Sequence, residues 1–195
     1  MWRRVTIKTP PAAQPLAPAD LANRLVVEDV AEHVLIGEFL RAAVSEIDGP
    51  NGIGVAIMHQ TWTLTLEQFA PIIDLPGWPV TGVAEIRYLD DAGAWQVVDP
   101  ASYRLIEGVD PVTVMPAQGA AWPRVTAQPG AVQIDYTLGA VLPAEADQGL
   151  VTAAAMIAGH LYENREAVAI GVSAVEIPLG AQHMLRRYRR TWGQV

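Results

Sequence analysis

The sequence predicts an α+β fold, because the spacing of its apolar residues changes twice along the chain. Apolar residues recur at helical spacing over 29–48, alternate strictly with polar residues over 61–67, and return to helical spacing over 144–165. The predicted strands therefore form one block between helices, which is typical of α+β proteins rather than of repeated βαβ units. The length of 195 residues suits one domain, or a compact domain with one projecting arm.

The N-terminal part predicts an arm followed by two helices. Residues 9–19 hold four prolines and favour an extended linker, so we expect residues 1–18 to form an N-terminal arm. A short helix is expected at 19–24. A longer helix over 29–48 ends at a Gly-Pro pair, which no helix continues through.

The central block predicts a β-region over about 55–140. Its clearest hairpin runs from 83–90 through an Asp-Ala-Gly turn into 95–99. Further short strands are expected at 103–106, 112–115 and 132–138. The many prolines between these segments favour strand edges and loops over one large continuous sheet.

The C-terminal part predicts one long helix and then an arm. The helix over 144–165 completes a body that spans 19–165, and residues 166–195 form a C-terminal arm that ends in an amphipathic helix. The apolar stripe of that helix contains Ala181, Leu185, Tyr188 and Trp192. Its other side is purely cationic and carries Arg186, Arg187, Arg189 and Arg190.

The composition limits what the protein can bind. The chain is 51% hydrophobic with only 17% charged residues, so we expect some apolar surface to be covered by other copies or by partners. The net charge is −8, which does not suit a general phosphate binder. All 21 acidic residues lie between two basic ends, and that middle segment contains only six arginines.

Several classes of protein are not expected from this sequence. The absence of cysteine excludes disulfides and thiolate metal sites. The N-terminus lacks the apolar core of a secretory signal, and no stretch approaches the roughly 20 apolar residues that a membrane span needs. The motifs of nucleotide-binding loops, zinc proteases and serine hydrolases are missing, so we expect neither an enzyme nor a cofactor.

Isolated residues that suggest a site have simpler interpretations. His160 and Glu163 stand one helical turn apart, but a metal site would need further ligands, and we predict none. Asp90 and Asp91 precede a glycine and predict a turn rather than a catalytic pair. Among tryptophans that could stack on a sugar or a base, Trp62 and Trp95 are interpreted as core residues. Two others, Trp78 and Trp122, each precede a proline and are interpreted as loop anchors.

Five ordered fragments resemble one family, the head–tail connector or adaptor proteins of tailed phages, prophages and gene transfer agents. The fragments are HQTWTLTLE (59–67), LPGWPVTGVAEIRYLDDAG (75–93), the segment from Pro116 to Pro123 that ends in AAWP, VQIDYTLG (132–139) and HLYENREAV (160–168). The resemblance covers roughly residues 16–192. The sequence departs from the family at the end of the second helix, DGPNGIGVA, and at Gly149, which interrupts the start of the third helix.

The resemblance implies a helical-bundle connector fold with an inserted small antiparallel β-region and a projecting C-terminal arm. By analogy, the protein forms a dodecameric ring under the portal protein, joins the capsid to the tail, and catalyses no reaction. Its tail-side partner is a stopper or tail terminator protein, and DNA passes through the lumen without specific binding. The protein is expected in the cytoplasm during assembly and then in the neck of a virion or gene-transfer particle, with no role for a membrane.

The cationic C-terminal helix suggests a docking site on the portal. We expect the following residues to bind it: Leu185, Arg186, Arg187, Tyr188, Arg189, Arg190 and Trp192. The alternative is that the helix packs on its own subunit with a solvated basic face. We also expect acidic residues of the body to line the lumen, where they repel DNA phosphates. A different class of function is a small cytoplasmic nucleic-acid-binding module that uses the same basic helix.

Overall fold

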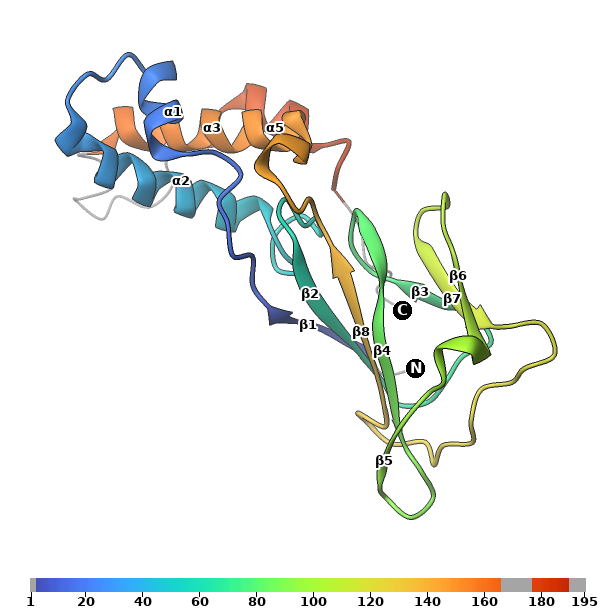
Figure 1. Cartoon of the computed structure of the whole chain (residues 1–195). Coiled ribbons are helices and arrows are strands. Elements are labelled where there is room, and N and C mark those ends of the chain that lie inside the picture. Colours follow the sequence, from blue (N-terminus) through green and yellow to red (C-terminus); the bar gives the residue numbers. More distant parts are fainter. Residues whose placement is uncertain (1–2, 166–176, 190–195) are drawn as a thin grey trace. The chain divides into compact units, whose positions relative to one another are not determined.

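The computed structural model describes residues 3–165 and 177–189 and divides the chain into two compact units (Figure 1). The β-unit consists of residues 1–10 and 59–139. The helical unit consists of residues 11–58 and 140–195. Each unit is therefore built from two separate stretches of the chain.

The larger sheet of the β-unit has five antiparallel strands in the order β1-β2-β8-β4-β5. Their bounds are β1 Arg3–Thr9, β2 Gln60–Leu66, β8 Val132–Leu138, β4 Val80–Leu89 and β5 Trp95–Val97. In β2 every second side chain is buried, as the strict alternation of the sequence predicts. Trp62 and Leu64 of β2 and Tyr136 of β8 are at most 1% exposed and form the core on this face.

A smaller sheet has three antiparallel strands in the order β3-β7-β6. Their bounds are β3 Ile73–Leu75, β7 Val112–Pro116 and β6 Tyr103–Ile106. The chain that follows β3 closes over the core of the larger sheet, where the Tyr136 hydroxyl donates to the carbonyl of Pro76 at 2.7 Å. Gly77 has φ +100°, and a Cβ there would lie 2.6 Å from the Trp62 ring, so only glycine fits.

The helical unit contains four α-helices among the described residues. They are α1 Pro18–Arg24, α2 His33–Ile47, α3 Gln148–Glu163 and α5 Leu179–Leu185. Helix α2 buries Ile36, Leu40, Ala43 and Ile47, which recur every three or four residues. Helix α3 buries small residues such as Ala154, Ala158 and Gly159, and α2 and α5 pack against it. Gly159 leaves room for Leu25, which follows α1. None of the described helices is long and apolar enough to cross a membrane.

The expected helical-bundle fold is wrong, although the broader α+β assignment fits. The described residues contain eight strands in two antiparallel sheets against four α-helices, so the strands are not a small insertion in a bundle. The reason is that the strands bury a complete core of their own around Trp62 and Tyr136. A block of strands with its own core forms a separate compact unit.

Most individual elements lie where the sequence predicts them, with two notable differences. The stretch expected to be an N-terminal arm contains strand β1, which pairs with β2 along the edge of the sheet. Trp95 is not a core residue, because β5 is an exposed edge strand and the Trp95 side chain is 47% exposed. The predicted turn at Asp90 is confirmed, since its carboxylate accepts hydrogen bonds from the amides of Ala92 and Ala94.

Candidate docking site at the C-terminal helix

Helix α5 packs on α3 through the apolar stripe that the sequence predicts. Ala181 is fully buried, and Leu185 and Tyr188 are only 8% and 7% exposed. Leu185 and Tyr188, two of the side chains expected to anchor the protein on a portal, therefore lie inside the helical unit in this structure. Arg186, Arg187 and Arg189 are exposed, so the cationic side of the segment is available to a partner.

A group of three side chains, called here the Tyr188 cluster, fastens the end of α5 to the start of α3. The Tyr188 hydroxyl donates to Oδ1 of Asp147 at 2.5 Å. The Arg187 guanidinium donates to the same hydroxyl at 2.7 Å and lies 4.7 Å from the centre of the Tyr188 ring. Hydrogen bonds that involve charged groups are among the stronger ones, so the cluster fixes the position of α5.

Asp147 also caps the N-terminus of α3. Its Oδ1 accepts hydrogen bonds from the amides of Gly149 at 2.8 Å and Leu150 at 3.2 Å. The carboxylate therefore begins one helix and holds the end of another. Loss of Asp147 would disturb both helices together.

Gly149 makes room for the Tyr188 cluster. A Cβ at this position would lie 2.4 Å from the Tyr188 hydroxyl and 2.5 Å from the Arg187 guanidinium. A glycine in the first turn of a helix costs stability in isolation, which is why the sequence marks it as an interruption. The structure gives the reason for it, since any larger residue would push the Tyr188 hydroxyl and the Arg187 guanidinium out of their positions in the cluster.

The electrostatics of the cluster favour a neutral tyrosine. Burial raises the pKa of Tyr188 above its ordinary value, and its hydrogen bond to Asp147 raises it further. Arg187 acts in the opposite direction but does not outweigh these effects. Tyr188 thus remains a hydrogen-bond donor to Asp147 throughout the neutral range.

Only part of the docking site that the sequence predicts lies within the described residues. The structure brings Leu185, Arg187 and Tyr188 together on α3, while Arg186 and Arg189 point to solvent as exposed side chains. The predicted site residues Arg190 and Trp192 lie outside the described residues. Sequence reasoning missed Asp147 as a partner, although an Asp just before a helical stripe is a signal for an N-cap.

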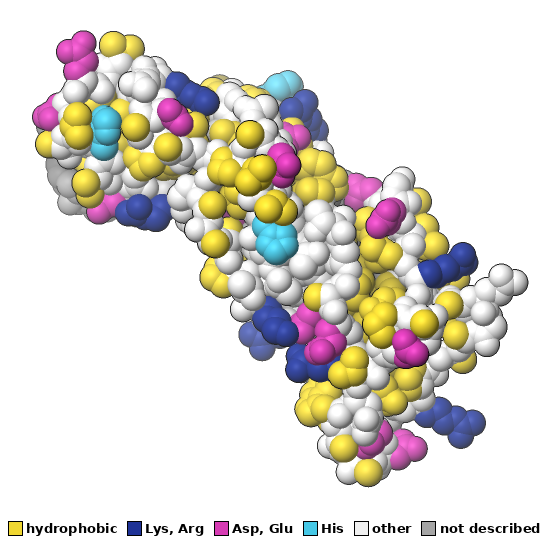
Figure 2. Space-filling view, in the orientation of Figure 1, with side chains coloured by type: hydrophobic (Ala, Val, Ile, Leu, Met, Phe, Trp, Pro, Cys, Tyr) yellow, Lys and Arg dark blue, Asp and Glu magenta, His cyan; other side chains and the backbone are white. Residues whose placement is uncertain are grey.

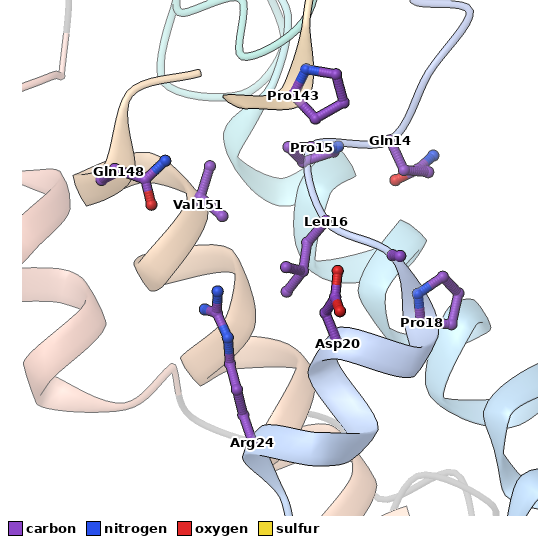
Figure 3. A pocket seen from close by; sticks show the side chains of 10 residues that line it. Gln14, Pro15, Leu16, Pro18, Asp20, Arg24, Pro143, Gln148 and Val151 are labelled. Carbon is purple, nitrogen blue, oxygen red and sulfur yellow. The ribbon is translucent and has the colours of Figure 1, made fainter. Parts of the chain in front are cut away.

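A groove of about 490 Å³ lies elsewhere in the helical unit, between the N-terminal segment, α1 and α3 (Figure 3). Asp20 and Arg24 supply its charged groups, and Leu16 and Val151 its apolar floor. Its lining residues include no histidine, serine or cysteine, so they do not pair a nucleophile with a base. Among residues 3–165 and 177–189, no cluster of three His, Cys, Asp or Glu could hold a metal ion.

Comparison with known proteins gives matches among solved structures. No protein-family profile and no curated protein matches the chain. A chain from the neck of an empty gene transfer agent (GTA) particle, described with C6 symmetry, is 25% identical and has a TM-score of 0.76; the match covers 97% of this chain and 98% of that one. A chain from the virion of a native GTA particle is also 25% identical, with a TM-score of 0.74 and 97% of both chains covered.

A third structure is the neck of a native GTA particle, described with C12 symmetry. Its chain is 26% identical with a TM-score of 0.71, and the match covers 99% of this chain and 98% of that one. All three matches extend over both compact units rather than over one of them. The resemblance of this chain to head–tail connector and adaptor proteins, first indicated by its sequence fragments, is thus confirmed over nearly its whole length by chains from GTA particles and their necks.

Proposed function

We propose that the protein is a structural, non-catalytic component of the neck of a phage-derived particle such as a gene transfer agent or a prophage virion. The observation that carries this proposal is the match over 97–99% of the chain to GTA neck and virion structures. The likeness extends over both compact units, so the fold as a whole resembles that of a particle component. The fold and its packing are therefore expected to serve assembly.

Within the neck, the protein forms a ring of identical subunits, dodecameric by analogy, between the portal protein and a tail-side stopper or terminator. Two of the similar structures are described with C6 and C12 symmetry, which supports a closed ring. The subunit would be made in the cytoplasm and then incorporated into the particle. DNA would pass through the lumen, where exposed acidic side chains repel its phosphates and prevent adhesion.

The C-terminal segment docks on the portal through its cationic side. The exposed Arg186 and Arg189 are suited to pair with carboxylates of a protein partner, because guanidinium groups bind carboxylates in a bidentate manner. Leu185 and Tyr188, buried on α3, hold these arginines in place, and Arg190 and Trp192 extend the site beyond the described residues. This division of roles predicts different outcomes for different variants.

Negative-stain microscopy of the purified chain, with and without portal protein, tests the proposed function. Rings, or assembly that depends on the portal, are the expected result. A protein that stays monomeric under both conditions would contradict the proposal. A gel shift that weakens steeply with salt would instead favour the nucleic-acid-binding alternative.

Variants of the C-terminal segment test the docking site. Deletion of residues 176–195, or the double change Arg186→Glu with Arg189→Glu, should abolish binding to portal-bearing capsids. Arg41→Glu is the matched control, because Arg41 is an exposed arginine of α2 in the same unit. Normal capsid binding by the truncated protein would show that docking occurs elsewhere.

The charge of the lumen is tested by a structure of the assembled ring. Acidic side chains from the segment between the two basic ends should face the DNA path. A lumen lined by arginines would contradict this part of the proposal.

A further inference from the structure

The five-stranded sheet has two open edges of opposite character. Strand β1 forms one edge, and its sequence RRVTIKT carries three basic residues and no acid. Lys8 is paired with Asp135 of β8, whereas Arg4 is exposed. The other edge is β5 with the turn that precedes it, where Asp90 and Asp91 lie at the tip of the β4–β5 hairpin. Figure 2 shows basic side chains next to an acidic group on the β1 side of the sheet, and acidic side chains at the hairpin tip.

Both edges also expose apolar side chains, although the Arg87 guanidinium lies over the Trp95 ring at 5.8 Å. On β5, Trp95 is 47% and Val97 is 60% exposed, and all three residues of the strand are exposed. On β1, Ile7 is 42% exposed. Edge strands also present backbone amide and carbonyl groups, so an uncovered edge readily takes up another strand or chain.

We propose that these two edges meet in the assembled ring: the β1 edge of one copy contacts the β4–β5 hairpin of the next copy. The inference rests on the proposed function and adds to it the surfaces that join the subunits. Charge complementarity selects the occupant, because a basic edge fits an acidic edge better than it fits a second copy of itself. A contact between two different surfaces of one molecule is heterologous and repeats around an axis, as in the similar structures with C6 and C12 symmetry.

Arg4 and Asp91 are the residues that best test this contact. Arg4 is exposed on β1 and lies opposite Thr65 of the neighbouring strand, so a change there leaves the core intact. Asp91 has one weak contact, at 3.5 Å from the Thr126 hydroxyl, whereas Asp90 holds the turn together. Substitution of Asp91 therefore changes the charge of the hairpin and spares its structure.

The experiment is a charge exchange on the full-length protein. Arg4→Glu and Asp91→Arg are made singly and together, and ring formation is measured by light scattering and negative-stain microscopy, with and without portal protein. Each single variant should raise the concentration needed for ring formation about tenfold or more, because like charges then face each other. The combined variant should return to within about threefold of the wild type. Arg104→Glu, an exposed arginine on the other sheet, is the control and should assemble normally.

The outcomes separate this inference from the function on which it rests. If the wild type forms rings and both single variants do so equally well, the edge contact is wrong and the neck ring stands. If the single variants fail and the combined variant, still folded by circular dichroism, is not restored, the pairing of these two edges is also wrong. If the wild type forms no ring with or without portal, both the ring and the contact are overturned.

Discussion

Substitution of Gly149 by alanine should destabilise the protein, although the same change stabilises most helices. In the interior of a helix, alanine is more favourable than glycine by about 1 kcal/mol. Here the added Cβ would lie 2.4 Å from the Tyr188 hydroxyl, which is closer than nonbonded atoms can approach. The Tyr188 side chain must therefore move away from Asp147.

The size of the effect follows from what that movement removes. The hydrogen bond from Tyr188 to the Asp147 carboxylate has a charged acceptor, and such a bond contributes about 1.5–3 kcal/mol. Subtracting the gain in helix propensity leaves a net loss of about 0.5–2 kcal/mol in the free energy of unfolding. Exposure of the buried tyrosine ring would add to this loss.

Urea-induced unfolding followed by circular dichroism measures the effect, and a double-mutant cycle isolates its cause. In a Tyr188→Ala background the clash with the hydroxyl is gone and the Arg187 guanidinium can swing aside. Gly149→Ala should then stabilise the helical unit by up to about 1 kcal/mol. If Gly149→Ala is neutral or stabilising in the otherwise unchanged protein, or has the same effect in both backgrounds, the role assigned to the cluster is wrong.

Three further predictions concern the β-unit and the effect of pH. Gly77→Ala should lower the free energy of unfolding by at least about 2 kcal/mol in urea titrations, because the added Cβ would meet a buried leucine at 2.5 Å and φ there is +100°. Asp135→Asn should cost about 1–3 kcal/mol in the same assay, since this carboxylate is 1% exposed and is paired with Lys8 at 2.5 Å. Because the pKa of Tyr188 is raised in the folded state, folding favours the neutral phenol. The contribution of Tyr188 to the free energy of unfolding is therefore complete below pH 10 and declines as the pH rises through the pKa of the folded state. Thermal unfolding above pH 10 should therefore be less pH-dependent in Tyr188→Phe than in the wild type.

Each of these predictions has a control or a contradicting result. Gly93→Ala, where an added Cβ meets no atom within 4 Å, separates the crowding at Gly77 from the strain of positive φ alone. Glu85→Gln removes an exposed carboxylate from the same sheet and should change stability by less than about 1 kcal/mol. Identical alkaline unfolding curves for Tyr188→Phe and the wild type would assign the pH dependence to other groups, such as the buried Tyr136, whose pKa burial also raises.

Local patterns in the sequence predict most elements, because the spacing of apolar residues and the residue types that favour turns depend only on neighbouring positions. Strands β2, β6 and β8 and helices α1 and α2 lie within a few residues of their predicted bounds. Helix α3 begins at Gln148 rather than 144, because Pro143–Glu145 forms a 3-10 turn and Asp147 supplies the cap. Strand β3 was not predicted, since three residues between prolines are too short to show a period.

Pairing over long distances could not be read from the sequence. Val5 and Ile7 alternate with polar residues as a strand does, but the neighbouring prolines favoured an arm, and β2 lies more than 50 residues further on. The partner of the docking segment is another long-range contact that could not be read from the sequence. The stripe of α5 predicts that Leu185 and Tyr188 bury a face, yet the partner Asp147 is 41 positions away, so the sequence could not say what that face meets.

The participation of β1 in the larger sheet has a practical consequence for anyone who wishes to cut the protein into fragments. The chain passes between the two units at residues 10–11, 58–59 and 139–140, so neither unit is a continuous stretch. A fragment of residues 59–139 would leave β2 without its neighbour β1, and the backbone of β2 would become an open, aggregation-prone edge. A version of the β-unit with this edge paired therefore needs residues 1–10 joined to this fragment by a linker in place of residues 11–58. Truncation from the N-terminus should damage the sheet rather than remove a dispensable tail.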